Sequence, residues 1–352
     1  MPCFYPLTAW RGKIVNPTGK RPLVFSANKA QWSDKPLEIA CGQCTGCRLN
    51  RSRQWAMRCM HEAQLYEKNI FLTLTFDEAT LYQRPNPFTV DVRDFQLFMK
   101  RLRKKYGKGI RFYHCGEYGE CCRLCGRSRT YCDCGVFHAS VGRPHYHACI
   151  FNHDFDDKEL YRVTHQGKRL YTSRSLSDLW PFGFATFGGV EFESAAYVAR
   201  YIMKKVNGEK ADEIDAFSLR PYERMNLTTG EVFLCAKEYT TMSRGGRGCN
   251  GENLGGIGKR WYDEYKDDVY PHDYVVVNGV KCRPPKYYDG LLEADRPYLF
   301  DDVILERVRN YNKSDLLLLK EYGNLYSIHK SKRLDDQKRN LAARLKMLPR
   351  NL

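Results

Sequence analysis

The sequence contains no apolar run long enough to cross a lipid bilayer, and it has no Walker-type phosphate loop. Its first residues, Met1 to Trp10, lack the charged head and the apolar stretch of a secretory signal. These absences argue against a transmembrane protein, a secreted protein and an attached helicase. We therefore expect the protein to act in a cytosol.

The charge balance is strongly basic. Lys and Arg number 57 against 41 Asp and Glu, for a formal net charge of +16. An excess of this size indicates a polyanionic partner, either nucleic acid or an anionic membrane surface. Hydrophobic residues make up 43% of the chain and aromatic residues 13%, which is typical of a folded protein. At 352 residues the chain can bury a sizeable core, and we expect more than one structural unit.

The 15 cysteines need an explanation, because a reducing cytosol disfavours a framework of disulfides. Cys41, Cys44 and Cys47 are separated by two residues each, and the intervening glycines let the backbone wrap around a metal ion. We expect zinc here, with an iron–sulfur cluster as the alternative. The fourth ligand stays open among Cys59, Cys3 and His61.

A second cysteine-rich stretch lies at about residues 119–142. Two close pairs of thiols across a short hairpin predict a structural zinc knuckle. The expected ligands are Cys122, Cys125, Cys132 and Cys134, with Cys121 as the alternative. The knuckle would hold an insertion that offers DNA the side chains of Arg123, Arg127 and Arg129.

The segment Gly142–Phe151 has the pattern of a β-strand that carries metal ligands. Successive side chains of a strand point to opposite faces, so His145 and His147 share one face while Tyr146 turns towards the core. A second strand is predicted from Ile110 and leads to Glu117, with Glu120 as the reserve carboxylate. Two imidazoles and one carboxylate with open water positions suit Mg²⁺ or Mn²⁺ acting on a phosphate ester.

A helix is predicted to begin at Ser194 as its N-cap and to run to about Lys205. Tyr197 and Tyr201 are four residues apart and therefore share a face, with Lys204 one turn further along the same side. Tyrosine is a weak nucleophile at its ordinary pKa of about 10, so a nearby ammonium group would help it attack a phosphodiester.

Hydrophobic periodicity predicts further elements. We expect a helix from Leu49 to about Lys68, a strand over Ile70–Phe76, a helix capped by Asp91, a hairpin turn at Asn278-Gly279 and a mainly helical chain from Asp301 onward. The helix after Asp91 has an apolar face formed by Phe95, Phe98, Met99 and Leu102. Residues up to about Pro36 show no clear period.

The His-x-His strand, the upstream carboxylate and the tyrosine-lysine helix together resemble the HUH endonuclease superfamily. More narrowly, the chain resembles the replication initiators of microviruses, especially the gokushovirus-like branch. The stretches that carry the resemblance are Cys41–Arg48, Phe71–Phe76, Cys115–Gly119, Arg143–His147, Tyr197–Lys205, Met242–Arg244 and Gly256–Trp261.

The resemblance covers roughly residues 40–265 and implies an α+β fold with a central antiparallel sheet of five strands flanked by helices. The Cys-rich zinc-binding insertion, longer than the family would lead one to expect, and the mainly helical C-terminal extension are read from the residues themselves. We expect an N-terminal Cys-rich segment and helix (residues 1–68), an HUH endonuclease core (69–265) and a partly helical, basic extension (266–352). The expected location is the cytoplasm of a bacterial host cell, with no membrane partner.

The resemblance also implies a mechanism, a metal-dependent nicking and joining of DNA. Mg²⁺ or Mn²⁺ held by His145, His147 and Glu117 would polarise a phosphate of single-stranded origin DNA, and Tyr197 or Tyr201 would attack it with help from Lys204. The 5′-phosphotyrosine intermediate leaves a 3′-hydroxyl that primes rolling-circle replication of a small circular phage genome by host polymerase and helicase. The alternatives are a zinc-stabilised nucleic-acid-binding protein without catalysis, and an HUH transposase or relaxase.

Overall fold

The computed structural model describes residues 3–16, 21–87, 89–119, 143–204, 212–214, 218–225, 230–248, 251–270 and 272–347. The chain forms two compact units, one made of Ser52–Pro297 and one made of Met1–Arg51 together with Tyr298–Leu352. The boundaries between these compact units lie near residues 51 and 297. The functional segments predicted from the sequence motifs, with boundaries at residues 68 and 265, remain a prediction.

The larger unit is built on an antiparallel sheet, which confirms the α+β class. Within the described residues the sheet has seven strands in the order β12-β5-β6-β4-β9-β8-β7, and every neighbouring pair is antiparallel. The strands are β4 (Asn69–Thr75), β5 (Arg111–Tyr118), β6 (Pro144–Phe151), β7 (Lys158–Val163), β8 (Arg169–Ser173), β9 (Ala185–Gly189) and β12 (Tyr239–Met242). The five strands that the resemblance implied were wrong, because the hairpin of β7 and β8 adds two strands at one edge of the sheet.

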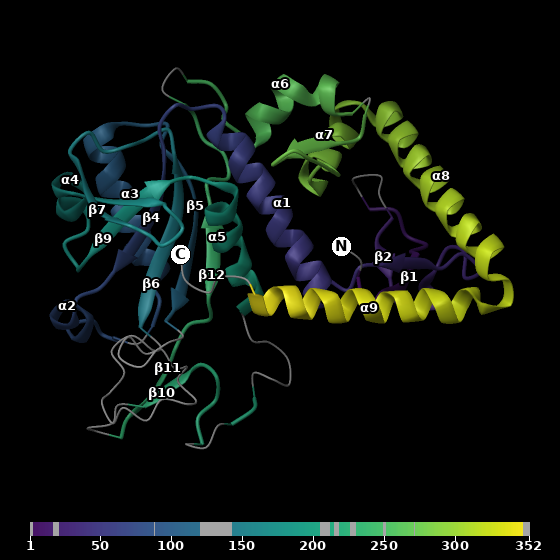
Figure 1. The fold of residues 1–352 in the computed structure, drawn as a ribbon, viewed down its shortest axis with the longest axis horizontal. Helices are drawn as coiled ribbons and strands as arrows, with labels where there is room; N and C mark the ends of the chain where they lie inside the picture. The colour runs from purple at the N-terminus through teal and green to yellow at the C-terminus, as the bar shows by residue number, and fades with distance from the viewer. Residues whose placement is uncertain are drawn as a thin grey trace. The chain divides into compact units, whose positions relative to one another are not determined.

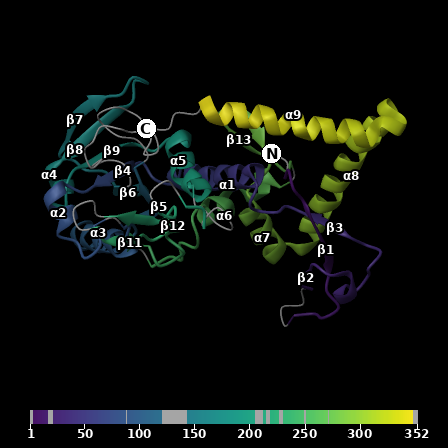
Figure 2. The ribbon, with the colours of Figure 1, turned by 90° about the horizontal axis from the view of Figure 1, so that it is seen from below.

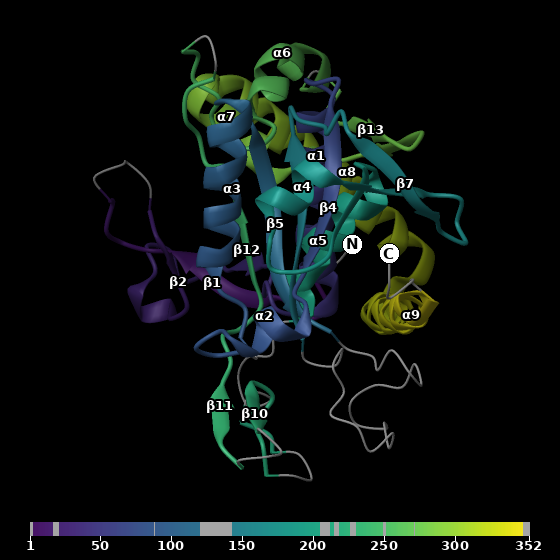
Figure 3. The ribbon, with the colours of Figure 1, turned by 90° about the vertical axis from the view of Figure 1, so that its left-hand side faces the viewer.

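One face of the sheet packs against α3 (Val92–Tyr106) and the short helix α4 (Arg174–Leu179) (Figure 3). The predicted apolar face of α3 is confirmed, since Phe95, Phe98, Met99 and Leu102 are all buried in the core. Asp91 caps this helix by accepting a hydrogen bond from the amide of Arg93 at 2.8 Å. A further short helix, α2 (Glu78–Tyr82), follows β4 directly.

The other face of the sheet is covered by α5 (Phe192–Lys204) and by the part of α1 (Thr45–Ala63) that follows Arg51 (Figure 1). The Trp55 ring of α1 stacks on Tyr113 of β5 with ring centroids 4.7 Å apart. This helix was predicted over Leu49 to Lys68, but it begins earlier, inside the Cys41–Cys47 motif, and ends earlier, at Ala63. Just beyond its end, the side-chain amide of Asn69 donates to the carbonyl oxygens of Ala63 and Tyr66.

A buried ion pair fixes the glycine-rich loop that ends at Gly258. Arg111 Nε lies 2.6 Å from Glu62 Oε1, and both side chains are almost fully buried. Glu62 accepts the amide hydrogen of Gly258, and Arg111 donates to the carbonyl of Gly255. Because both charged side chains also bind this backbone, the segment from 255 to 258 is held against the core, with Ile257 fully buried.

The remaining elements of the larger unit lie outside this sheet. They are β10 (Glu223–Met225), β11 (Val232–Leu234), α6 (Lys259–Val269), β13 (Val275–Val277), β14 (Val280–Cys282) and α7 (Lys286–Asp295). The predicted Asn278-Gly279 turn is confirmed between β13 and β14, where both residues have the positive φ that such hairpin turns require.

The smaller unit has a three-stranded sheet in the order β2-β1-β3. Its strands are β1 (Leu7–Arg11), β2 (Leu23–Val24) and β3 (Leu37–Ile39), and a short 3-10 helix, η1 (Ala27–Lys29), lies between β2 and β3 in the chain. These strands are short, which explains why the sequence showed no period there. The helical C-terminal stretch is confirmed as α8 (Pro297–Tyr322), η4 (Gly323–Leu325) and α9 (Tyr326–Met347) (Figure 2). Among the helices that the structure describes, none combines the length and the apolar character needed to span a membrane.

Candidate metal centre

Two histidines and one glutamate meet on the face of the sheet that α1 and α5 cover. Cross-strand pairing places Glu117 of β5 directly opposite His145 of β6, so the two side chains share a face. Glu117 Oε1 lies 2.8 Å from His145 Nε2 and 2.9 Å from His147 Nε2. The Glu117 side chain is 1% exposed and those of His145 and His147 are 19% and 9% exposed, so the group opens to solvent on the His145 side.

The hydrogen bonds of His145 require a cation or an additional proton at this centre. Its Nδ1 lies 3.1 Å from the carbonyl oxygen of Arg143, which only accepts, so Nδ1 must donate. Its Nε2 faces a second acceptor, the carboxylate of Glu117. A neutral imidazole has a single N–H, so either a second proton or a metal ion must lie between Nε2 and the carboxylate.

The distances fit a divalent cation. Octahedral coordination with ligands at about 2.0–2.1 Å places neighbouring ligand atoms about 3 Å apart, close to the separations found here. The three ligand atoms lie within 4.8 Å of one another, and the group can hold a metal ion. Burial alone would raise the pKa of Glu117, but the two adjacent histidines outweigh it and lower that pKa to about 2. The carboxylate is therefore ionised and available as a ligand at neutral pH.

A hydroxyl group orients the second imidazole. Thr73 of β4 pairs with His147 across the strands, and its Oγ1 lies 3.0 Å from His147 Nδ1. This contact fixes the orientation of the imidazole ring and leaves Nε2 directed at Glu117. In metal sites, a hydrogen-bond partner on the other ring nitrogen of a histidine ligand orients that ligand in the same way. The contact of Thr73 with a histidine was not predicted from the sequence. The signal for it is the alternation of threonine with apolar residues in β4, which places the Thr73 hydroxyl on the face opposite the core.

Core-facing tyrosines hold the two ligand strands in place. Tyr146, between the two histidines, donates to Asp94 Oδ2 at 2.6 Å and accepts from the amide of Asp91 at 3.0 Å. Tyr118, next to Glu117, donates to the carbonyl of Ala236 and accepts from the amide of Val90. Burial raises the pKa of both phenols, so they stay protonated donors.

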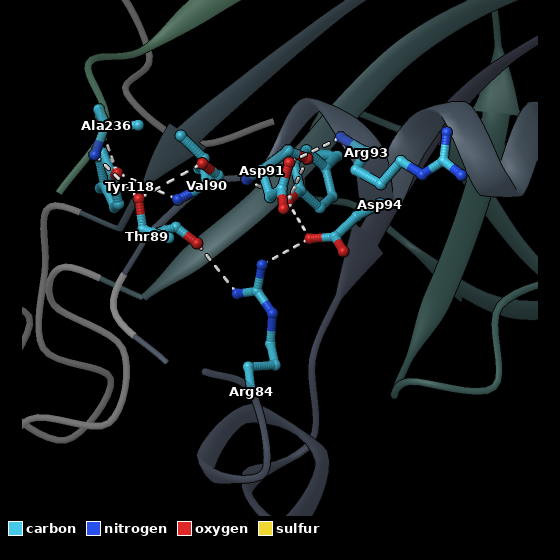
Figure 4. A network of polar contacts seen from close by, with 9 residues as sticks. Arg84, Thr89, Val90, Asp91, Arg93, Asp94, Tyr118 and Ala236 are labelled. Atoms are coloured by element: carbon cyan, nitrogen blue, oxygen red, sulfur yellow. Dashed lines mark hydrogen bonds and ion pairs between the residues drawn. The ribbon is translucent and has the colours of Figure 1, made fainter. Parts of the chain in front are cut away.

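Both tyrosines thus connect to the start of α3. Figure 4 shows the surrounding network, in which Arg84 binds the carbonyl of Thr89 and the carboxylate of Asp94. The Arg84–Asp94 pair at 2.6 Å is mostly buried. The prediction that Tyr146 faces the core is confirmed, and the network couples the position of the ligand strands to the cap of α3.

Tyr197 of α5 lies against the candidate metal ligand His147. Its ring is perpendicular to that of His147, with centroids 5.1 Å apart, and it also meets the edge of Phe71. The helix begins at Phe192, two residues before the predicted cap, because the Ser194 hydroxyl bonds the backbone of Glu191 from inside the first turn. Tyr201 and Lys204 belong to the last part of α5, and their side chains lie outside the described residues.

A second candidate centre lies in the smaller unit. The thiols of Cys3, Cys41, Cys44 and Cys47 all lie within 4.8 Å of one another, and the group can hold a metal ion. Of the open choices for the fourth ligand, Cys3 joins the other three. Cys59 instead lies buried in the larger unit beside Cys149, and His61 stacks on Trp261.

Backbone amides already point at these thiols. The amide of Phe4 donates to Cys44 Sγ, that of Cys41 to Cys3 Sγ and that of Cys44 to Cys41 Sγ, at 3.3–3.4 Å. Burial works against ionisation, but amide hydrogen bonds lower the pKa of Cys44 to about 6, while burial and the neighbouring thiols raise that of Cys47 to about 12. Amide donors of this kind stabilise thiolate ligands.

The remaining predicted ligands lie outside the described residues, namely Glu120, Cys121, Cys122, Cys125, Cys132 and Cys134. The zinc knuckle at about residues 119–142 therefore stays a prediction.

Comparisons with known proteins place these residues in context. Residues 69–206, which span β4 to the end of α5, match the family model of the replication-associated protein ORF2/G2P. The chain is similar to the replication-associated protein VP4 of Bdellovibrio phage phiMH2K, with 30% identity over 337 residues that cover 96% of this chain and 88% of that protein.

Two further relatives have the same identity of 30%. The replication-associated protein ORF2 of Spiroplasma virus 4 matches over 270 residues, covering 73% of this chain and 68% of that protein. The replication-associated protein ORF4 of Chlamydia phage 1 matches over 263 residues, covering 72% and 53%. No solved structure matches the chain significantly.

Proposed function

Because the chain belongs to the family of phage replication-associated proteins, we propose that it initiates rolling-circle replication by nicking single-stranded origin DNA. The position of Tyr197 carries this proposal. Its phenol ring packs against His147, so a residue of α5 that can supply an oxygen nucleophile adjoins the candidate metal ligands of the sheet. A protein that only binds DNA would not need this combination.

In the proposed reaction, the phenolic oxygen of Tyr197 or Tyr201 attacks a phosphorus atom of the DNA backbone. A new O–P bond forms to the 5′-phosphate, the bond to the 3′ oxygen breaks, and that oxygen takes up a proton to become a 3′-hydroxyl. The freed 3′ end primes synthesis, and the second tyrosine cuts the regenerated origin so that the ends can be joined. Lys204 follows on the same helix, and its ammonium group stabilises the attacking phenolate or the phosphate.

His145, His147 and Glu117 are the residues that would hold Mg²⁺ or Mn²⁺. When bound, such an ion polarises the scissile phosphate and stabilises the charge that develops on its oxygens. Carboxylate and imidazole ligands with an open side suit these ions. The outward exposure of His145, compared with the buried Glu117, gives the phosphate a side from which to approach.

We assign zinc to the thiols of Cys3, Cys41, Cys44 and Cys47. Four thiolates with amide hydrogen bonds are typical of closed structural zinc sites. Such a site ties the beginning of the chain to the first turn of α1, where Cys47 lies. An iron–sulfur cluster would use the same ligands and is distinguished by its colour and iron content.

The proposal also includes partners and a location. Single-stranded DNA accounts for the charge of +16. The 3′-hydroxyl requires a polymerase and the displaced strand a helicase, and both are expected from the host, in whose cytoplasm the protein would act.

The test uses the full-length protein, Mn²⁺ and labelled single-stranded circular DNA of the phage genome. The wild type should form a protein–DNA adduct that survives denaturation. His147→Ala should abolish the adduct by removing a metal ligand, and Tyr197→Phe combined with Tyr201→Phe should abolish it by removing both phenols. Tyr298→Phe, at an exposed position of α8, is the matched control and should form the adduct normally. An adduct in the double phenylalanine variant would refute the assigned nucleophiles.

A further inference from the structure

The metal ligands belong to a row of cross-strand partners that runs across four strands. Glu117 of β5 pairs with His145 of β6, and His145 pairs with Thr75 of β4. Thr75 in turn donates to the carbonyl oxygen of Phe184 through both its amide, at 2.9 Å, and its hydroxyl, at 2.8 Å. Phe184 directly precedes β9, so it continues the row on the next strand.

The side chain of Phe184 lies on the face of the sheet that carries the metal ligands. Its neighbour Ala185 pairs with Leu74, and both are buried in the core on the opposite face. Because successive strand residues alternate, Phe184 points to the same face as Thr75 and His145. Two strand spacings of about 4.8 Å separate it from His145, which gives about 10 Å between the backbones.

Phe184 is paired with a second exposed aromatic residue. The ring of Tyr161 in β7 meets that of Phe184 with centroids 5.1 Å apart and an interplanar angle of 61°. Phe184 is 48% exposed and Tyr161 is 52% exposed, although each has a large aromatic ring. Tyr161 is the extra residue where the β7–β8 register shifts between Leu160 and Arg162, and such bulges re-aim side chains.

The chemistry of this pair suits nucleic-acid bases. Bases stack on aromatic rings without regard to sequence, because every base has a π face. The guanidinium of Arg162 lies 5.9 Å from the Tyr161 ring, so a cation accompanies the rings as it does in single-strand binding sites. Two half-exposed rings, inclined at 61° to each other beside a phosphate site, are of the size to hold one or two nucleotides.

We propose that Phe184 and Tyr161 form a stacking platform for the bases of single-stranded DNA next to the phosphate bound at the metal centre. The inference rests on the proposed function, because it assigns the flank of the same site. Stacking on the platform holds the strand across β4 and β9, so that the scissile phosphate stays at His145 and His147 while the tyrosine attacks.

The test measures binding without cleavage, in EDTA. The probes are a fluorescein-labelled oligothymidylate of about 12 nucleotides and an abasic strand of the same length, which keeps the phosphates but has no bases. Phe184→Ala and Tyr161→Ala should each weaken binding of the oligothymidylate about 5- to 100-fold. Phe184→Trp should retain it. Binding of the abasic strand should be equal in wild type and variants, because it involves only phosphate contacts.

The matched control is Phe25→Ala, which removes a phenylalanine that is 64% exposed in the smaller unit and should leave both affinities unchanged. The platform is refuted if Phe184→Ala binds the oligothymidylate as the wild type does, or if it weakens the abasic strand equally. Adduct formation by the wild type on phage DNA is scored separately. If the wild type forms the adduct and Phe184→Ala binds normally, the platform fails alone; if the wild type forms no adduct, the proposed function fails.

Discussion

Replacing Thr73 by valine tests whether the hydroxyl that contacts His147 tunes the metal centre. With a cation on Nε2, the Nδ1–H of His147 donates to Thr73 Oγ1, which lies 3.0 Å away. Valine has nearly the same shape but cannot accept, so a largely buried N–H loses its partner at a cost of about 1–3 kcal/mol. Outer partners of metal-bound histidines change metal affinity about 10- to 100-fold, which agrees with that cost.

The expected result is a dissociation constant for Mn²⁺ that is about 10- to 100-fold higher in Thr73→Val than in the wild type. Titration calorimetry with Mn²⁺ in the absence of DNA measures it directly. Thr75→Val is the matched control, because Thr75 lies two residues further on the same face and its hydroxyl donates to the Phe184 carbonyl instead of a histidine. The reasoning is wrong if Thr73→Val binds Mn²⁺ as tightly as the wild type, or if Thr75→Val loses as much affinity.

Three further predictions follow from other parts of the molecule. Cys3→Ser should contain one equivalent of zinc less than the wild type by elemental analysis, whereas the buried Cys282→Ser should keep the wild-type content; equal contents would exclude Cys3 as a ligand. Burial lowers the pKa of His61 to about 3, against about 6.5 in the unfolded chain. Between these two values only the unfolded state binds the proton, so the free energy of unfolding decreases by about 1.4 kcal/mol for each unit by which the pH is lowered. His61→Phe should remove this slope from urea unfolding between about pH 6 and pH 5, and an unchanged slope would contradict the assignment. Finally, the logarithm of the DNA affinity should fall with the logarithm of salt concentration by about 0.7 per phosphate contacted, so a flat response would argue against DNA as the partner.

The sequence predicted local elements well where one face of the chain is buried. The apolar spacing of α3, its cap at Asp91 and the turn at Asn278-Gly279 all depend on neighbours within a few residues. Boundaries were less accurate where a distant contact decides them. The helix α1 begins early, inside the thiol motif, and α5 begins before Ser194 because that hydroxyl bonds back to Glu191.

The number of strands in the sheet could not be predicted from periodicity. All of β7 is exposed, so it has no alternation of buried and exposed residues to mark it as a strand. It is held by pairing with β8, and β8 joins the sheet through Tyr171 and Phe187. Pairing of that kind depends on partners far along the chain, which a local pattern does not contain.

The sequence by itself determined which residues are candidates for the chemistry. Two histidines two residues apart share a face of a strand because successive side chains alternate, and closely spaced cysteines can converge on one metal ion. Only the tertiary structure decided the register that sets Glu117 opposite His145, the approach of Tyr197 to His147 and the choice of Cys3 as the fourth thiol. Those contacts join residues far apart in the chain, and they are fixed by strand pairing and core packing, which no local spacing specifies.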